Sequence, residues 1–356
     1  MNCLLTQLKA RLADLDLKEE EAAAIATAVD TVLADARLLE VAQSLYHALF
    51  VQEKLLDRES ITQWQDAYGE ETIGCHMLFT VIMFARAYEL TASKHYVYDN
   101  EALNFFAPLL RHFRGNVETY DSVGLQEVKR FWTYCYLKPI FFELGRLAFE
   151  ITEYPYQFHV YQDPATGKTF PVALAGLRFD EAGLPDNDGS FVTTLEKNGD
   201  TLSGYTYTSD GHIDFEKKTF HNYTCVLNNT DMALAIHMPG NKKLSEDAVT
   251  KSLEGAKQFF ATYFPNLNYK AFISSSWLLD TGLSAVLKED SNIMKMQKRF
   301  RIVLSAKNNG PLFNNVFGVN KCPIEELVPR NRFQTELLQR IKDGGSLYSG
   351  RGYILK

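Results

Sequence analysis

The residues best suited to acid–base chemistry lie in one apolar stretch, MALAIHMP, in which His237 is the only ionisable side chain. Histidine titrates near neutral pH and can accept the proton of an attacking amine or hydroxyl. Ala233 and Ala235 share one alternating face with His237, so small side chains leave room beside the imidazole. His237 is therefore a candidate general base; the alternative is a buried histidine that is hydrogen-bonded within a sheet.

Three consecutive hydroxyls stand in a second apolar stretch, AFISSSWLLD. A buried hydroxyl without a partner costs about 1–3 kcal/mol, so Ser274, Ser275 and Ser276 must each meet backbone, water or a ligand. Two roles are open to the three serines: they position substrate or protonate a leaving thiolate, or they bond to backbone at a strand end, which is slightly favoured. Ser275 and Ser276 are the catalytic candidates among them. A hydrolase with a serine nucleophile is disfavoured because the chain has no G-x-S-x-G elbow.

Other polar residues near these stretches have either a structural or a functional role. Asp280 is favoured as a helix cap over a base. Asn292 either hydrogen-bonds the cofactor's amide groups or is a turn or cap residue. A solvated basic face is favoured over phosphate contact for Lys298, Arg299 and Arg301.

Two strands must position His237 and the serines. Both alternating faces of Met232–Met238 are apolar, which predicts a strand that is buried on both sides. Pro239 has no N–H to donate, so we expect pairing to stop there and to open a wedge in the sheet. The second strand is Lys270–Leu279.

A helix joins these strands. Ser245 is a plausible N-cap, and Glu246 and Asp247 suit the first turn. Apolar residues then recur at helical spacing and predict one buried stripe: Val249, Leu253, Ala256, Phe260 and Tyr263.

The chain changes character near Tyr154. Before it, helical periodicity covers Leu17–Phe50, Ile73–Leu90 and Asp121–Glu150, with Pro139 expected to kink or split the last helix. After it, aromatic and β-branched segments alternate with turns, which predicts antiparallel hairpins that MALAIHMP continues. We therefore expect an α+β chain with a helical domain at 1–152 and a mixed-sheet domain at 153–356.

Two aromatic segments of the helical half, Phe105–Phe113 and Arg130–Phe142, are expected to form helical core. The alternative is a contribution to an acceptor pocket against the second domain, because ligand sites favour domain interfaces.

Composition excludes several classes of protein. The formal net charge of −7 argues against general nucleic-acid binding, which requires a basic surface. No apolar run reaches the ~20 residues of a membrane span, and the histidines show no metal-ligand spacing. Five scattered cysteines without a CxxC pair suit a reducing cytoplasm.

The motifs of residues 231–304 resemble a known family. HMPG, the helix SLEGAKQFF, SSWLLD, SNI and RF are similar to bacterial acyltransferase-domain proteins with a helical N-terminal domain and a GNAT-like C-terminal domain. The resemblance extends upstream through LRFDEAGLP and downstream to the glycine-containing tail. It implies a mixed, splayed sheet in which acyl-CoA lies in the V between two strands, here Met232–Met238 and Lys270–Leu279.

The resemblance also implies where the donor binds. The usual pyrophosphate loop, Q/R-x-x-G-x-G/A, is absent, and GNKKLSED occupies its place, while a serine stands where the family commonly has a cysteine at the start of SSSW. A helix N-terminus and two lysines can still hold phosphate, although Glu246 and Asp247 oppose it. The expected donor-binding residues are Ile236, Met238, Gly240, Lys242, Lys243, Ser274 and Asn292.

The sequence therefore predicts a cytoplasmic acyltransferase that uses acyl-CoA, without a metal, a nucleic acid or a membrane as partner. The acceptor is a small molecule whose amine or hydroxyl attacks directly in a ternary complex. Backbone N–H groups around His237 and Met238 are expected to polarise the thioester carbonyl. The alternative is a GNAT-like ligand-binding protein without catalysis, which the missing phosphate loop favours.

Overall fold

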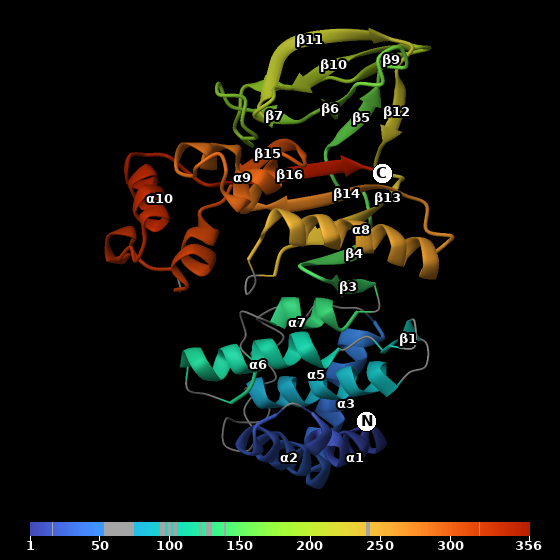
Figure 1. The fold of residues 1–356 in the computed structure, drawn as a ribbon, viewed down its shortest axis with the longest axis vertical. Coiled ribbons are helices and arrows are strands. Elements are labelled where there is room, and N and C mark those ends of the chain that lie inside the picture. The colour runs from blue at the N-terminus through green and yellow to red at the C-terminus, as the bar shows by residue number, and fades with distance from the viewer. Residues whose placement is uncertain are drawn as a thin grey trace. The chain divides into compact units, whose positions relative to one another are not determined.

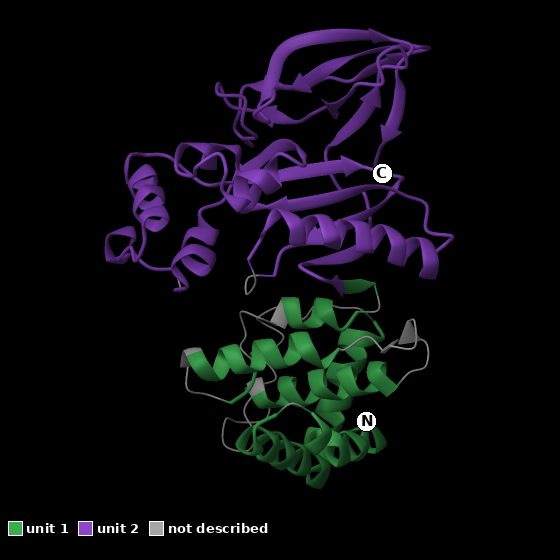
Figure 2. Cartoon of the chain, in the orientation of Figure 1, with its two compact units in different colours: residues 1–142 green, residues 143–356 purple. Residues whose placement is uncertain are grey.

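The structure is a computed structural model, and it divides into two compact units, Met1–Phe142 and Glu143–Lys356 (Figure 2). It describes residues 1–15, 17–52, 75–92, 97–98, 101–102, 105–120, 123–125, 130–138, 140–239, 243–319 and 321–356. Within these ranges, no helix combines the length and the apolar character that crossing a bilayer requires.

Helices make up most of the first unit (Figure 1). They are α1 (Asn2–Arg11), η1 (Leu12–Asp14), α2 (Glu19–Ala34), α3 (Ala36–Phe50), α5 (Cys75–Ala92), α6 (Phe106–Tyr120) and α7 (Arg130–Tyr136). A two-residue hairpin, β1 (Val97–Tyr98) with β2 (Glu101–Ala102), lies between α5 and α6. The sequence predicts helices in this half of the chain, and the helices named above confirm that prediction.

Asp35 divides the predicted helix 17–50 into α2 and α3. Its backbone is extended, and its carboxylate accepts from the N–H groups of Arg37 and Leu38, which caps α3. The break also resets the buried stripe: Val32 is the last buried residue of α2, and Leu38 is the first of α3.

The second unit contains two larger sheets. The central sheet has the order β15-β16-β14-β13-β4-β3. Its strands are β3 (Phe141–Leu144), β4 (Leu147–Glu153), β13 (Met232–His237), β14 (Tyr269–Ser276), β15 (Arg301–Lys307) and β16 (Tyr348–Leu355). Only β13 and β14 pair in parallel within the registers described. The tail strand β16 thus lies inside the sheet, between β14 and β15.

The other large sheet is antiparallel, with the order β11-β10-β6-β5-β12 and β9 beside β10. Its strands are β5 (Phe158–Gln162), β6 (Thr169–Ala173), β9 (Glu196–Asn198), β10 (Thr201–Tyr207), β11 (Ile213–His221) and β12 (Thr224–Leu227). A short hairpin, β7 (Arg178–Phe179) with β8 (Phe191–Val192), adjoins it. The predicted hairpins are therefore present.

Helices and short turns complete the second unit. They are α8 (Glu246–Tyr263), η4 (Trp277–Leu279), η5 (Thr281–Ala285), α9 (Asn292–Gln297), η6 (Leu312–Phe317), η7 (Ile324–Glu326) and α10 (Arg332–Lys342). Gly344, with a φ of 90°, follows α10, where glycine adopts the left-handed conformation that commonly ends a helix.

Three expectations from the sequence are wrong. Residues 141–150 are not helical, because Gly145 turns the chain with a φ of 72° between β3 and β4. β13 does not continue the hairpin sheet; it pairs with β4 and β14 in the central sheet. The polar segment SDGHIDFEKK predicts a loop at 209–218, but it becomes strand from Ile213 onward. Pro139 lies outside the described residues.

The pairing of β4 with β13 assigns residues 147–153 to the second unit. The helical unit ends at Phe142, so the division falls within β3, whereas the sequence predicts a boundary between residues 152 and 153.

The central sheet is covered on both faces. On one face, α8 packs through Phe260, whose ring lies 6.5 Å from that of Phe149 on β4. On the other face, residues of the antiparallel sheet such as Phe158 join Ala233 and Ile273 in one buried cluster. Because β13 is covered on both sides, Ala233, Leu234 and Ile236 are buried, as the sequence predicts, while Met232 and Ala235 are half-buried.

Candidate active site

The central strands β13 and β14 separate part-way along their length. Their parallel ladder ends at the pair Ala235 and Ile273. Beyond this pair, β13 stays paired with β4 as far as His237, and β14 stays paired with β16 as far as Ser276. The sheet therefore opens between β13 and β14, while each of them stays hydrogen-bonded to its other neighbouring strand. The ladder ends before Pro239, so the opening begins earlier than the proline predicts.

His237 lies at the end of β13, beside this opening. Its Nε2 is 3.0 Å from the Glu150 carboxylate, and both side chains are about a quarter exposed, at 24% and 23%. Glu150 pairs across the sheet with Ala235, while His237 pairs with Ala148, so the two side chains are diagonal neighbours on one face. A carboxylate at one ring nitrogen fixes the tautomer that carries a proton there and makes the other nitrogen the basic one.

Glu150 was not identified from the sequence. It belongs to LAFEITE, which was assigned to a helix, although its alternating pattern suits a strand. The signal is weak because Glu150 becomes His237's neighbour only through strand pairing, across 87 residues of chain.

The three serines have different surroundings. Ser274 is buried, and its Oγ donates to the Ile236 carbonyl at 2.9 Å, where the next rung of the parallel ladder would lie. Ser276 Oγ accepts from the Leu278 N–H at 3.2 Å and caps η4. Ser275 is exposed on the same face as Ile273 and His237. Two hydroxyls are thus bonded to backbone, and Ser275 faces the opening.

The residues expected to bind the donor are only partly brought together. Ile236 is buried and Met238 half-buried at the end of β13. Lys243 is exposed just before α8, whereas Asn292 is the exposed first residue of α9. Gly240 and Lys242 lie outside the described residues.

The start of α8 carries charges of both signs. Glu246 pairs with Lys295 at 3.3 Å, and Asp247 pairs with Lys251 at 3.0 Å. Arg299 donates to Thr250 Oγ1 at 2.6 Å. The two acids that oppose phosphate binding are therefore each balanced by a lysine, although such exposed pairs are weak.

A buried arginine, Arg146, lies against the same end of α8. Its Nε donates to the Lys243 carbonyl at 3.0 Å, and its N–H donates to Ser252 Oγ at 2.7 Å. The turn before it leaves no room for a side chain, because a Cβ on Gly145 would lie 2.9 Å from Ser252 Oγ. The sequence did not single out Arg146, since its approach to α8 depends on the β3–β4 turn.

Other charged candidates have structural partners. Lys298 pairs with Glu289 at 2.7 Å, and Arg301 donates to the carbonyls of Tyr207 and Thr208. Asp280 is fully buried; it accepts from the Gly282 N–H at 2.8 Å, which agrees with the preferred capping role.

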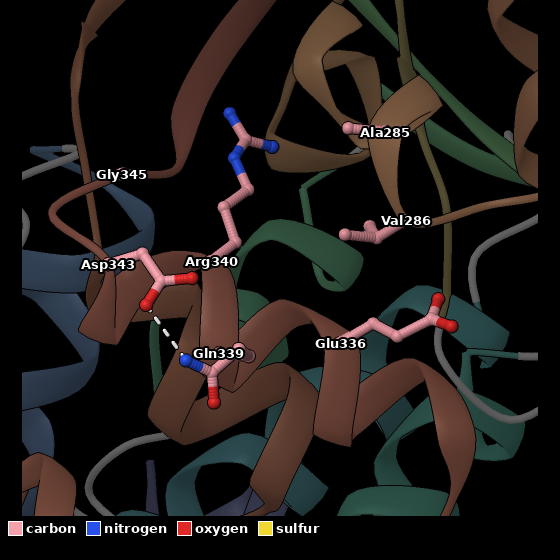
Figure 3. A pocket seen from close by; sticks show the side chains of 7 residues that line it. All are labelled: Ala285, Val286, Glu336, Gln339, Arg340, Asp343 and Gly345. Carbon is pink, nitrogen blue, oxygen red and sulfur yellow. Dashed lines mark hydrogen bonds between the residues drawn. The ribbon is translucent and has the colours of Figure 1, made fainter.

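A surface pocket of about 510 Å³ lies beside α10 (Figure 3). Its charged lining is already engaged: Asp343 accepts from Gln339 at 2.8 Å, and Glu336 pairs with Arg332 at 2.6 Å. None of the candidate site residues lines this pocket, which is formed by Ala285, Val286, Glu336, Gln339, Arg340, Asp343 and Gly345. In the described part of the chain, no cluster of His, Cys, Asp or Glu is arranged to hold a metal ion.

Three solved structures resemble the chain in fold. An acyltransferase in complex with decanoyl-CoA and teicoplanin is 17% identical, with a TM-score of 0.57 over 98% of this chain and 87% of that one. An acyltransferase mutant in complex with octanoyl-CoA is 16% identical, with a TM-score of 0.58 over 98% and 88%. A complex with CoA and 10C-teicoplanin is 16% identical, with a TM-score of 0.54 over 92% and 83%. No curated protein matches the sequence.

The family described as the GNAT-like C-terminal domain matches residues 141–354. This range begins at β3 and ends within β16, so it covers the whole central sheet and the opening beside His237. The chain therefore belongs to the family of proteins with a GNAT-like C-terminal domain, here preceded by a helical N-terminal unit.

Proposed function

We propose that this protein is an acyltransferase that moves an acyl group from acyl-CoA to an amine or hydroxyl of a small-molecule acceptor. The observation that carries the proposal is the opening between β13 and β14, with the His237–Glu150 pair at its edge. Such a gap offers space for an extended thioester. A base near it can take the acceptor's proton, and N–H donors can stabilise the oxyanion.

The proposed chemistry is direct attack in a ternary complex. The acceptor nitrogen or oxygen bonds to the thioester carbon, and His237 takes the proton that the acceptor loses. Backbone N–H groups around His237 and Met238 stabilise the oxyanion. The C–S bond then breaks, and the CoA thiolate takes a proton; Ser275 and Ser276 are the proposed hydroxyls for this step or for positioning substrate.

The proposed donor site extends from the opening to the start of α8. Ile236, Met238 and Ser274 are the proposed donor contacts at the opening. Gly240, Lys242 and Lys243 are the proposed contacts next to the start of α8, whose N-terminal amides suit phosphate. Arg146 adds positive charge at the same end of α8. Asn292 keeps its proposed role in binding the donor's amides.

The solved neighbours support acyl-CoA as donor, because two of them are complexes with decanoyl-CoA or octanoyl-CoA. We propose the cytoplasm as the setting, with neither nucleic acid nor membrane as partner. The cysteines whose side chains are described, Cys3, Cys135, Cys225 and Cys322, are free thiols, which supports a reducing compartment.

A GNAT-like ligand-binding protein without catalysis is the second candidate. One observation favours it: Glu246 and Asp247 place two carboxylates in the first turn of α8, where the donor's phosphates would lie. Donor binding and turnover separate the two candidates.

Donor binding is tested by thermal unfolding with acetyl-CoA, octanoyl-CoA and decanoyl-CoA. A ligand at 100 times its Kd should stabilise the protein by about 2.7 kcal/mol. Release of free CoA in the presence of a panel of amines then tests for transfer. Binding without transfer to any acceptor would favour the second candidate, and absence of binding by every acyl-CoA would contradict the proposed acyltransferase.

Substitution of the base tests the mechanism. We expect His237→Ala to lower kcat by about 10²- to 10⁴-fold, the usual contribution of general base catalysis. His221→Ala is the matched control, because His221 lies on β11 and contacts Thr201. Full turnover by a folded His237→Ala variant would remove His237 from the reaction.

A further inference from the structure

Three residues form a row across the central sheet at the opening. Ser275 on β14 pairs with Arg351 on β16. The last parallel pair joins Ala235 to Ile273, so His237 stands level with Ser275 two positions further on. Residues level across a sheet project from the same face. Arg351, Ser275 and His237 therefore share one face, just beyond the point where the ladder ends.

Arg351 is a half-buried cation without a counter-charge. Among the residues that the structure describes, its guanidinium makes a cation–π contact with Tyr156, at 5.8 Å from the ring centroid, and no hydrogen bond or ion pair. Arg301, on the neighbouring strand β15, differs because it donates to two backbone carbonyls. The charge of Arg351 is thus left available to a ligand.

The tyrosines near Arg351 are neutral, and the carboxylate on this face, Glu150, is paired with His237. Burial raises the pKa of Tyr154, Tyr156 and Tyr207, and the Arg351 guanidinium opposes that rise in each case without reversing it. These phenols are therefore uncharged near neutral pH and supply no anion. A partly desolvated cation is costly unless an anion accompanies it, and a planar guanidinium matches a carboxylate or phosphate through two parallel hydrogen bonds.

The face of the sheet on which Arg351 lies indicates that it contacts the acceptor and not the donor. The helix α8 packs on Phe149, and Ile236 is the register partner of Phe149 on β13. Because alternate residues face opposite sides of a strand, His237 lies on the face away from α8, together with Ser275 and Arg351. The donor's phosphates belong to the α8 end of the proposed site, so Arg351 serves a different group.

We propose that Arg351 binds an anionic group of the acceptor, which makes the acceptor an amine or hydroxyl compound that also carries a carboxylate or phosphate. This inference rests on the proposed acyltransferase function and adds the class of acceptor. One strand spacing of about 4.8 Å separates Arg351 from Ser275 at the backbone. The step from Ser275 to His237 is wider because β13 and β14 have already separated there, so a spacer joins the acceptor's nucleophile to its anion.

Matched acceptors test the proposal. Glycine, 4-aminobutyrate and 6-aminohexanoate are compared with ethylamine, butylamine and hexylamine, which replace the carboxylate by a methyl group. Phosphoethanolamine against ethanolamine tests phosphate instead. With octanoyl-CoA as donor, we expect at least one anionic acceptor to exceed its neutral twin in kcat/KM by about tenfold or more, the usual gain from a charge-assisted bidentate contact.

Variants assign that preference to Arg351. Arg351→Met should remove the anionic acceptor's advantage, and Arg351→Lys should keep part of it, since charge remains and the planar fork is lost. Arg332→Met is the matched control, because that arginine pairs with Glu336 on α10. Thermal unfolding of each variant checks folding, and the Kd of octanoyl-CoA should not change.

Calorimetry gives a readout that does not depend on turnover. The same acceptors are titrated into wild-type protein saturated with CoA, where we expect the anionic twin to bind more tightly and Arg351→Met to abolish the difference.

The proposal is overturned if no anionic acceptor binds or reacts better than its twin, or if Arg351→Met keeps the preference. It is also overturned if Arg351→Met weakens octanoyl-CoA binding alone, which would assign Arg351 to the donor. Failure of every amine to release CoA would count against the acyltransferase itself, while the calorimetric comparison still decides the role of Arg351.

Discussion

At the scale of single residues, the site depends on which groups accompany His237. The two tautomers of an isolated imidazole interconvert, whereas Glu150 at 3.0 Å from Nε2 selects the one that carries its proton on that nitrogen. The same orienting arrangement of carboxylate and imidazole recurs in enzymes that abstract protons from a nucleophile. In the proposed mechanism Glu150 is therefore a positioning residue.

Glu150→Gln tests this positioning role. The amide keeps the size of the side chain but removes the charge, so we expect kcat to fall by about 10- to 100-fold with little change in the KM for acyl-CoA. Steady-state kinetics together with a thermal unfolding control separate this outcome from misfolding. Partial recovery in Glu150→Asp is expected, and equal losses in kcat and in donor affinity would indicate a purely structural contact.

At the scale of elements, the opening is maintained by outer strands and by one hydroxyl. β4 and β16 stay paired with β13 and β14 past the point where these two separate. Ser274 bridges them by donating to the Ile236 carbonyl, which would otherwise be an unsatisfied buried acceptor. The wedge is therefore a stable part of the sheet.

Ser274→Ala should destabilise the protein by about 1–3 kcal/mol, because it leaves that buried carbonyl without its donor. Ser275→Ala, one residue further along the same strand, removes an exposed hydroxyl and should change the free energy of unfolding by less than about 0.5 kcal/mol. Urea unfolding of both variants measures the difference. Similar effects at the two positions would refute the bridging role of Ser274.

At the scale of the whole molecule, one buried acid connects segments that are distant in sequence. Asp280 accepts from the N–H groups of Gly282 and Tyr348, and its carboxylate lies 3.9 Å from Arg340 on α10. Burial nevertheless raises the pKa of Asp280 above its ordinary value of 3.8, despite these three favourable contacts.

A raised pKa in the folded state means that folding favours the protonated acid. The stabilising contribution is complete below the unfolded value of 3.8 and is lost as pH rises through the folded pKa. Asp280→Asn removes this titration, so the stability of wild type relative to the variant should fall as the pH is raised from 3.8 toward neutrality. Urea unfolding across that range measures the difference, and a difference that does not vary with pH would contradict the expectation.

The sequence by itself determined the local elements and the residues at the end of β13. Continuous apolar character defined Met232–His237, the stripe from Val249 to Phe260 defined α8, and one ionisable side chain in an apolar strand identified His237. These features depend on neighbouring residues, whose spacing the sequence contains directly. The helical first unit was predictable for the same reason.

Only the tertiary structure decided which residues meet at the opening. Glu150 reaches His237, and Arg351 stands level with Ser275, through strand pairings that join distant parts of the chain. The assignment of residues 141–150 to a helix failed because a short alternating segment is ambiguous until a partner strand bonds its backbone. Likewise, the order β16-β14-β13-β4 places the C-terminal strand beside the centre of the sheet. Local periodicity specifies which face of a strand is apolar, but pairing over long separations decides its neighbours, and those neighbours make the site.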